Sequence, residues 1–420
     1  MKAAVSAGSN GYNAFLGLFK HITYKNSLSI PPVLRNTPRI TKPIVSAPMN
    51  GWAGPKLVSA VANHGGLPIY AIGYFTNPDA IVKDLLTIPS TIAHDDHSKE
   101  EESAVAAAPV QQQQQGRPHQ RYMPYAVGFV TFWLDRQGPE LLLRILRGEG
   151  DPKFSKGAAL EEVRPPAAIW LSFGNYRPYL DLIRHHGAPE TRVIVQVQTL
   201  EEAIEAQKNK VDVIVLQGTE SGGHGAQRVV PLFTFLPEAV QALKDNAEAS
   251  GGQLPIPPLL AAGGISTGKQ FLTTTILGAS GVVIGTGFMP TVESAGPQHA
   301  KERLLKIQDG GVSTVRTRIF DELREFDYPI GFDGRVVRNL VTEREEEDQR
   351  KLGLYEQTGE DSFKLLKEDR SGTKADWVRA TQEQDFDLLP LWSGTGVGML
   401  TKQGTAAEFM DQLLDPNGRP

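Results

Sequence analysis

His224 is the residue whose surroundings in the sequence most favour catalysis. It lies in Val211–Gln227, where an apolar, β-branched run at 211–216 is followed by a glycine-rich loop. Such a run is typical of a strand buried on both faces, and parallel α/β folds gather their chemistry at the carboxyl ends of such strands. Because an imidazole titrates near neutral pH, the pattern predicts a general base at His224. A histidine that only binds a ligand or packs in the loop is the alternative.

Two later segments carry glycines directly after a predicted strand: AAGGISTG (Ala261–Gly268) and VVIGTGF (Val282–Phe288). In a barrel of alternating strands and helices, the last two such junctions often bind phosphate through backbone N–H groups and a helix N-terminus. The pair therefore predicts a ligand with a terminal phosphate. The alternative is that Gly263 and Gly264 only permit a tight turn.

Gln196 and Gln217 each end a predicted strand, so their amide groups are expected at the same edge of the sheet as His224. Buried amides need hydrogen-bond partners. The edge of a bound heterocycle would supply one. Core amides that are satisfied by other protein groups are the alternative.

The elements that must position these residues form eight strand-then-helix units between Pro43 and Ile307. Such alternation implies a parallel α/β sheet, and eight units in about 265 residues fit a (β/α)8 TIM barrel. A doubly wound sheet is the alternative, but its first turn would usually carry a glycine-rich fingerprint, and Ala47–Gly51 reads APMNG. The predicted strands are 43–49, 67–73, 125–130, 167–173, 192–197, 211–216, 258–262 and 282–284. The predicted helices are 55–64, 77–86, 135–147, 177–186, 199–209, 232–245, 267–277 and 298–307.

The barrel is expected to occupy residues 41–310, between an N-terminal extension at 1–40 and a further domain at 311–420. Within the barrel, residues 93–121 consist of charges, alanines and a run of glutamines, which indicates a disordered, low-complexity surface insertion. Residues 311–420 are charged and carry helical patterns, so we expect a smaller, mainly helical C-terminal domain that caps the barrel.

The composition excludes several classes of function. A net charge of −5 and a pI near 6.0 give no electrostatic reason to expect a nucleic acid or an anionic membrane as partner. The absence of cysteine excludes disulfides, thiolate metal sites and cysteine nucleophiles. His94 and His97 have the spacing of metal ligands, but they lie in the low-complexity insertion, so no metal site is expected. No apolar run approaches the roughly 20 residues of a membrane span.

The N-terminal region is basic, because no Asp or Glu precedes Asp79. With its serines, this composition is similar to that of a transit peptide. We expect a cytoplasmic protein with a poorly ordered extension, and a mitochondrial protein is the alternative.

Several motifs together resemble a known family. They are PIVSAPMNG (43–51), VDVIVLQGTESGGHG (211–225), LLAAGGI (259–265), LGASGVVIGTGFMPTVES (277–294), GFDGRVVRN (331–339) and LWSGTGVGML (391–400). In this order they resemble the nitronate monooxygenases, formerly called 2-nitropropane dioxygenases, and most closely the fungal-type branch. Flavin-dependent quinone reductases and enoyl reductases on the same barrel share many of these motifs.

The resemblance implies an FMN cofactor, no metal, and a set of residues around the flavin. Ala47, Pro48, Met49 and Asn50 would line the isoalloxazine, with Gly128 facing it and Gln196 and Gln217 presenting amides to it. Gly218 and Gly223 would pass near the ribityl chain, and Gly263, Gly264, Gly285 and Thr286 would bind the phosphate. His224 falls on the catalytic histidine of the family.

The implied reaction is the oxidation of alkyl nitronates, and of nitroalkanes, by O₂ to carbonyl compounds and nitrite. His224 would first remove the α-proton of a neutral nitroalkane. The partners are then a small-molecule substrate and O₂, with no nucleic acid and no membrane. The alternatives are an FMN-dependent NAD(P)H reductase of quinones or enones, a flavin oxidase or monooxygenase of secondary metabolism, and a flavin-free barrel that binds a phosphate ligand.

Four positions depart from the family pattern. Ser221 replaces a usual Ala, Gly287 replaces a usual Arg, and Thr395 replaces a common Gln. Gly128 stands where some members have an Asn that faces the flavin. Because these positions are expected to surround the pocket, the resemblance leaves the identity of the substrate open.

Overall fold

The computed structural model describes residues 40–75, 77–92, 123–148, 165–189, 191–326, 328–351 and 371–415. The predicted insertion at 93–121 lies outside the described residues, and so does all of the N-terminal extension except residue 40.

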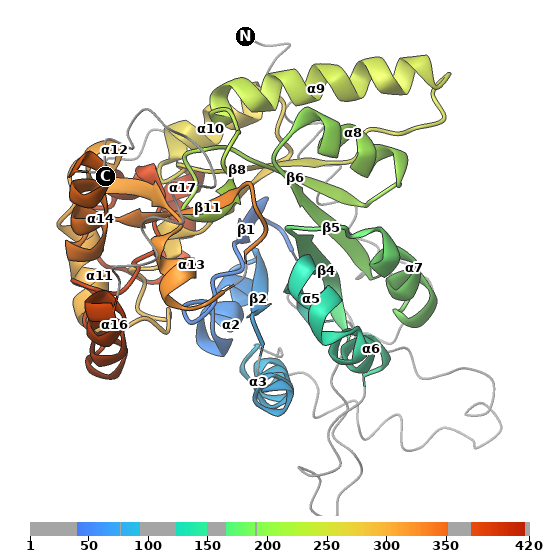
Figure 1. Ribbon diagram of the computed structural model, residues 1–420. Coiled ribbons are helices and arrows are strands. Elements are labelled where there is room, and N and C mark those ends of the chain that lie inside the picture. Colours follow the sequence, from blue (N-terminus) through green and yellow to red (C-terminus); the bar gives the residue numbers. More distant parts are fainter. Residues whose placement is uncertain are drawn as a thin grey trace, which may run out of the picture.

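Eight parallel strands close into a barrel (Figure 1), which confirms the predicted fold class. The last strand pairs with the first, since Val45 is the register partner of Val283. The strands are β1 (Ile44–Ser46), β2 (Leu67–Gly73), β3 (Met123–Val130), β4 (Pro166–Ser172), β5 (Arg192–Val197), β6 (Val213–Gln217), β8 (Leu259–Ala262) and β9 (Gly281–Ile284).

The strands are mostly apolar because both of their faces are buried. In β6, Val213 and Val215 belong to the cluster inside the barrel, whereas Ile214 and Leu216 belong to the cluster between the barrel and its helices. This alternation follows from the two-residue period of a strand. Burial of one such side chain contributes about 1.5–3 kcal/mol, so the two clusters together hold the carboxyl ends of the strands in place.

The helices follow the strands as predicted, with three main differences, one of which is that the helix predicted at 77–86 continues to Thr91. The single helix predicted at 135–147 is two helices, because Gly138 has φ +80° and Pro139 has no N–H to continue the ladder. The helix predicted at 232–245 continues to Ala249. The helices are α2 (Pro55–Asn63), α3 (Pro78–Thr91), α5 (Thr131–Gln137), α6 (Glu140–Arg147), α7 (Arg177–His186), α8 (Leu200–Lys208), α9 (Leu232–Ala249), α10 (Gly268–Ile276) and α11 (Gln298–Leu305).

The segment after the barrel contains helices and also a small antiparallel sheet. Its order is β10–β11–β7, and β7 comes from the loop after β6. This sheet ties the loop that contains His224 to the C-terminal segment, which lies beside the barrel in Figure 1. The elements are β7 (Gly223–Ala226), β10 (Thr314–Thr317), β11 (Phe332–Val337), α12 (Gly310–Ser313), α13 (Ile319–Leu323), α14 (Leu340–Lys351), α16 (Ser371–Glu383), η5 (Thr395–Met399) and α17 (Ala406–Leu414).

Helix α17 returns to the barrel. The Phe409 ring packs edge-on against Phe288, which follows β9, with 5.2 Å between ring centroids. Asp411 accepts a hydrogen bond of 2.9 Å from Lys42 at the opposite end of the barrel sequence. Helix α17 therefore contacts both the first and the last unit of the barrel. None of the helices that the structure describes is long and apolar enough to cross a membrane.

Candidate active site

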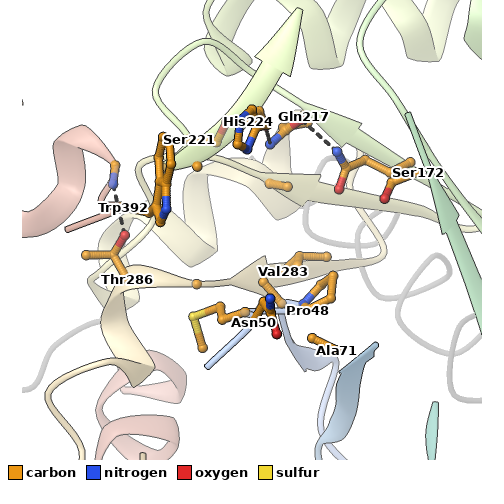
Figure 2. A pocket seen from close by; sticks show the side chains of 18 of the residues that line it. Pro48, Asn50, Ala71, Ser172, Gln217, Ser221, His224, Val283, Thr286 and Trp392 are labelled. Atoms are coloured by element: carbon orange, nitrogen blue, oxygen red, sulfur yellow. Dashed lines mark hydrogen bonds between the residues drawn. The ribbon is translucent and has the colours of Figure 1, made fainter. Parts of the chain in front are cut away.

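A cavity of about 250 Å³ opens at the carboxyl ends of the barrel strands. Residues that follow β1, β2, β4, β8 and β9 line it, together with residues of the C-terminal segment. Figure 2 shows side chains from these elements converging on one space.

All predicted site residues except Gly218 line this cavity. They are Ala47, Pro48, Met49, Asn50, Gly128, Gln196, Gln217, Gly223, His224, Gly263, Gly264, Gly285 and Thr286. A Cβ added at Gly218 would lie 2.4 Å from the backbone nitrogen of Leu232. Gly218 therefore serves the close approach of its loop to helix α9, and it does not line the cavity.

His224 lies on β7, where its register partner is Gly334 of β11. Its Nε2 lies 2.8 Å and 2.9 Å from the two carboxylate oxygens of Asp321. The ring stacks on Tyr328 with 3.9 Å between centroids and a 2° angle between planes, and Trp392 lies 4.8 Å away on a tilted plane. A carboxylate and two aromatic rings thus fix the position and the plane of the imidazole.

Asp321 belongs to α13 and also pairs with an arginine. Its side chain is only 2% exposed, and its Oδ1 accepts a hydrogen bond of 3.0 Å from Nη2 of Arg324. The sequence analysis did not find Asp321 or Arg324. Their segment is 97 residues from His224 in the chain, and neither residue ends a barrel strand.

These contacts favour a neutral imidazole. Burial lowers the pKa of His224, and the charge of Arg324 lowers it further, while the hydrogen bond and the charge of Asp321 oppose this shift. With its proton on Nε2 for donation to Asp321, the ring carries a lone pair on Nδ1. Such a ring can accept a proton at neutral pH.

Glu220, which is close to His224 in the sequence, has a different partner. Its two carboxylate oxygens accept hydrogen bonds of 3.0 Å and 2.8 Å from the backbone N–H of Leu232. A carboxylate at the N-terminus of α9 is stabilised by the unpaired N–H groups and the helix dipole. Glu220 therefore caps a helix and leaves Asp321 as the carboxylate of the histidine.

The amides of three glutamines form a chain beneath the histidine. Oε1 of Gln217 accepts hydrogen bonds from Gln196 (2.7 Å) and Gln198 (2.6 Å), and its Nε2 donates to the carbonyl of His224 (3.2 Å). Gln217 is thus a satisfied core amide. No described residue donates to Oε1 of Gln196, so this oxygen remains available to a ligand in the cavity.

The junction after β8 approaches the loop after β6 so closely that a side chain at either of its two glycines would crowd that loop. A Cβ added at Gly263 would lie 3.2 Å from the backbone nitrogen of Ser221, and one at Gly264 would lie 3.0 Å from Cβ of Glu220. Both glycines have positive φ, of +124° and +68°. The hydroxyl of Thr286 accepts a hydrogen bond of 3.0 Å from Gly394. Three loops therefore form a cradle of backbone groups that suits a phosphate.

Two departures from the family pattern have a steric reason. A Cβ at Gly287 would lie 2.1 Å from the ring of Phe409, so an arginine has no room there. A Cβ at Gly128 would lie 3.0 Å from side-chain carbons of both Ile69 and Pro48. A larger side chain at position 128 would therefore have to displace Ile69 or Pro48.

Of the four other histidines that the structure describes, three have structural partners (His64, His185 and His299), and His186 is exposed on α7. His64 lies 2.7 Å from Asp411, and Nδ1 of His185 lies 2.7 Å from the carbonyl oxygen of Asp181. His94 and His97 lie outside the described residues. Among the described residues, no three His, Asp or Glu side chains form a group that could hold a metal ion.

Comparison with known proteins shows which family this sequence matches. The model of the family described as nitronate monooxygenase matches residues 142–415. The nitronate monooxygenase npaC of Metarhizium robertsii is 32% identical over 305 residues, which is 70% of this chain and 72% of the relative.

Two solved structures share the fold. FabK from Thermotoga maritima has a TM-score of 0.61 at 21% identity and covers 90% of this chain and 93% of its own. Nitroalkane oxidase from Streptomyces ansochromogenes has a TM-score of 0.56 at 23% identity and covers 89% of this chain and 95% of its own.

Proposed function

The chain belongs to the nitronate monooxygenase family, and we propose that its cavity binds FMN and oxidises alkyl nitronates with O₂ to carbonyl compounds and nitrite. The observation that carries the proposal is the 2.8 Å contact between Nε2 of His224 and Asp321, at a cavity whose lining also includes the glycines of the last two strand–helix junctions. The family membership supports the reaction, and the geometry supports the cofactor and the residues.

Two groups of residues in the cavity lining suit the two ends of FMN, the phosphate and the ring. The loop cradle of Gly263, Gly264, Gly285 and Thr286 would hold the phosphate through backbone groups. Residues Ala47 to Asn50 would line the ring, and the free Oε1 of Gln196 would accept a hydrogen bond from it. Bound FMN would supply the electron transfer from the nitronate to O₂, while the protein positions the substrate and excludes water.

His224 would act as the base when the substrate is a neutral nitroalkane. The α C–H bond breaks, the proton moves to Nδ1, and the electron pair passes to the nitro oxygens to form the nitronate. Asp321 would stabilise the imidazolium that results, as a carboxylate beside a catalytic histidine does. A substrate supplied as the nitronate needs no such step.

The test is an anaerobic spectrum of the purified protein before and after addition of butyl 1-nitronate. A yellow protein that is bleached by the nitronate, and that releases nitrite when air is admitted, is the expected result. A colourless protein would contradict the flavin. Bleaching by NADH or NADPH without response to the nitronate would favour a reductase.

The His224→Asn variant tests the base separately. It is expected to retain FMN and to oxidise butyl 1-nitronate, and to lose activity on 1-nitrobutane on the order of 10²–10⁴-fold, the usual contribution of a general base. His185→Asn on the exposed face of α7 is the matched control and should behave like the unchanged protein. Full turnover of 1-nitrobutane by His224→Asn would refute the role.

A further inference from the structure

Arg324 gives the cavity an unusual electrostatic character. Among the described residues that line the cavity, Arg324 is the only lysine or arginine, and no aspartate or glutamate is present. Asp321, which pairs with Arg324, lies behind the lining. A ligand in the cavity therefore meets one fixed cation without a neighbouring exposed anion.

The guanidinium of Arg324 is held rigidly. Its Nε donates to the carbonyl of Phe320 (3.0 Å) and its Nη2 to Asp321 (3.0 Å). Its Cζ lies 4.7 Å from the ring centroid of Phe326 and 5.3 Å from that of Trp392. No described residue accepts a hydrogen bond from Nη1. The side chain is 20% exposed, so a preorganised charged donor remains available to a ligand.

We propose, on the basis of the proposed function, that Arg324 binds the nitro group of the substrate and selects substrates by the single negative charge of the nitronate. The planar guanidinium suits the two coplanar oxygens of a nitronate, as it suits a carboxylate. Because Asp321 contacts both Arg324 and His224, the group that binds the oxygens is fixed relative to the group that removes the proton.

The balance of charges supports this assignment. Before proton transfer, the Asp321 carboxylate faces Arg324 and a neutral imidazole. After proton transfer, the site holds two cations, the imidazolium and Arg324, and two anions, Asp321 and the nitronate. Each anion then has a cation beside it, so no unpaired charge is left in a partly buried site. Without Arg324, the nitronate would form with no cation at its oxygens.

The remaining walls indicate the carbon part of the substrate. Tyr74, Phe173, Tyr328 and Trp392 line the cavity around Arg324 and His224. Aromatic walls favour an apolar substituent, and a second carboxylate on the substrate would find no second cation in the described lining. The class that fits is a monoanionic nitronate with an alkyl or aryl substituent.

The test combines substrate kinetics with binding of an inert analogue. Pentanoate has the chain length of butyl 1-nitronate, and its carboxylate matches the nitronate in shape and charge. Arg324→Met is expected to raise the KM for butyl 1-nitronate and to weaken pentanoate binding, measured by calorimetry, each on the order of 10- to 100-fold. The kcat should change by less than about threefold, because a ground-state contact mainly affects KM.

Two further variants separate a binding role from a folding role. Arg324→Lys keeps the charge and should give intermediate affinities. Arg344→Met on α14, an exposed arginine outside the cavity lining, should leave both affinities unchanged. Unchanged pentanoate affinity in folded Arg324→Met would overturn the inference. If the unchanged protein binds pentanoate through Arg324 but oxidises no nitronate, the proposed function fails while the anion site stands.

Discussion

Replacement of Asp321 by Asn tests whether the carboxylate orients the imidazole of His224 and stabilises its protonated form. Asn has the same shape, and it replaces the charged acceptor that receives hydrogen bonds from His224 and Arg324. The Asn amide can also donate a hydrogen bond to Nε2, which would place the ring proton on Nδ1, the atom that must accept the substrate proton. The variant therefore changes the tautomer of His224 without removing the ring.

The size of the effect follows from the contacts. Loss of the carboxylate removes the group that stabilises the imidazolium at 2.8 Å, and a general base contributes about 10²–10⁴-fold. We expect kcat/KM for 1-nitrobutane to fall on the order of 10²–10³-fold. Hydrogen bonds to charged groups contribute about 1.5–3 kcal/mol each. Against a typical stability of about 5–15 kcal/mol, the variant should remain folded.

The pH dependence gives a second readout. The base must be neutral, so kcat/KM for the nitroalkane falls as the pH drops through the pKa of His224. Burial places that pKa below its ordinary value of 6.5. Asp321 raises the pKa of His224, so its replacement lowers it further and should move the acidic limb of the profile to lower pH.

The assay compares two substrates across pH 5 to 8, a range chosen around the ordinary pKa of histidine, about 6.5. The unchanged protein and the Asp321→Asn variant are given 1-nitrobutane and, separately, butyl 1-nitronate, and nitrite release is measured. The nitronate needs no proton removal, so its kcat should change by less than about threefold. Equal losses on both substrates would show that Asp321 only maintains the structure. A nitroalkane rate within threefold of the unchanged protein would refute the dyad.

Two other substitutions test the packing behind the cavity and the hydrogen bonds of its glutamines. Gly287→Arg should lower the free energy of unfolding by about 1–3 kcal/mol, because Phe409 occupies the space of its Cβ. Urea unfolding measures this change. The additional substitution Phe409→Ala should restore part of the lost stability. Gln217→Leu leaves the amides of Gln196 and Gln198 without their acceptor, so FMN retention after dialysis should fall on the order of tenfold, whereas Gln241→Leu on the exposed face of α9 should retain it.

The barrel could be predicted because its strands and helices are specified by residues that are close together in the sequence. The run of apolar residues at 211–216 identifies a strand with two buried faces, and the capping box of Thr199 and Glu202 marks the start of a helix. The carboxyl ends of parallel strands share one edge, so Gln196 and Gly263 could be placed beside His224 before any contact was known. The break between α5 and α6 is also encoded locally, by Gly138 and Pro139, although the periodicity alone predicts one helix over 135–147.

The partners of His224 could not be predicted because they lie about a hundred residues away in the sequence. Asp321 lies on the short helix α13 and Arg324 directly follows it, so neither residue ends a barrel strand. They are brought to the site of His224 because β11 pairs both with β7 and with β10, the strand that precedes α13. That pairing is antiparallel and joins segments about a hundred residues apart. Hydrophobic periodicity indicates that a strand exists, but it does not say with which distant strand it pairs.

The antiparallel sheet also explains why motifs far from the barrel belong to the same family pattern. Gly334, in the motif at 331–339, is opposite His224, and a Cβ there would lie 2.2 Å from the indole ring of Trp392. Trp392, in the motif at 391–400, can approach the histidine only because position 334 is a glycine. The two C-terminal motifs therefore hold the imidazole between Trp392 and Tyr328. The barrel supplies most of the cavity lining, and the C-terminal segment supplies the carboxylate and the rings that position the proposed base.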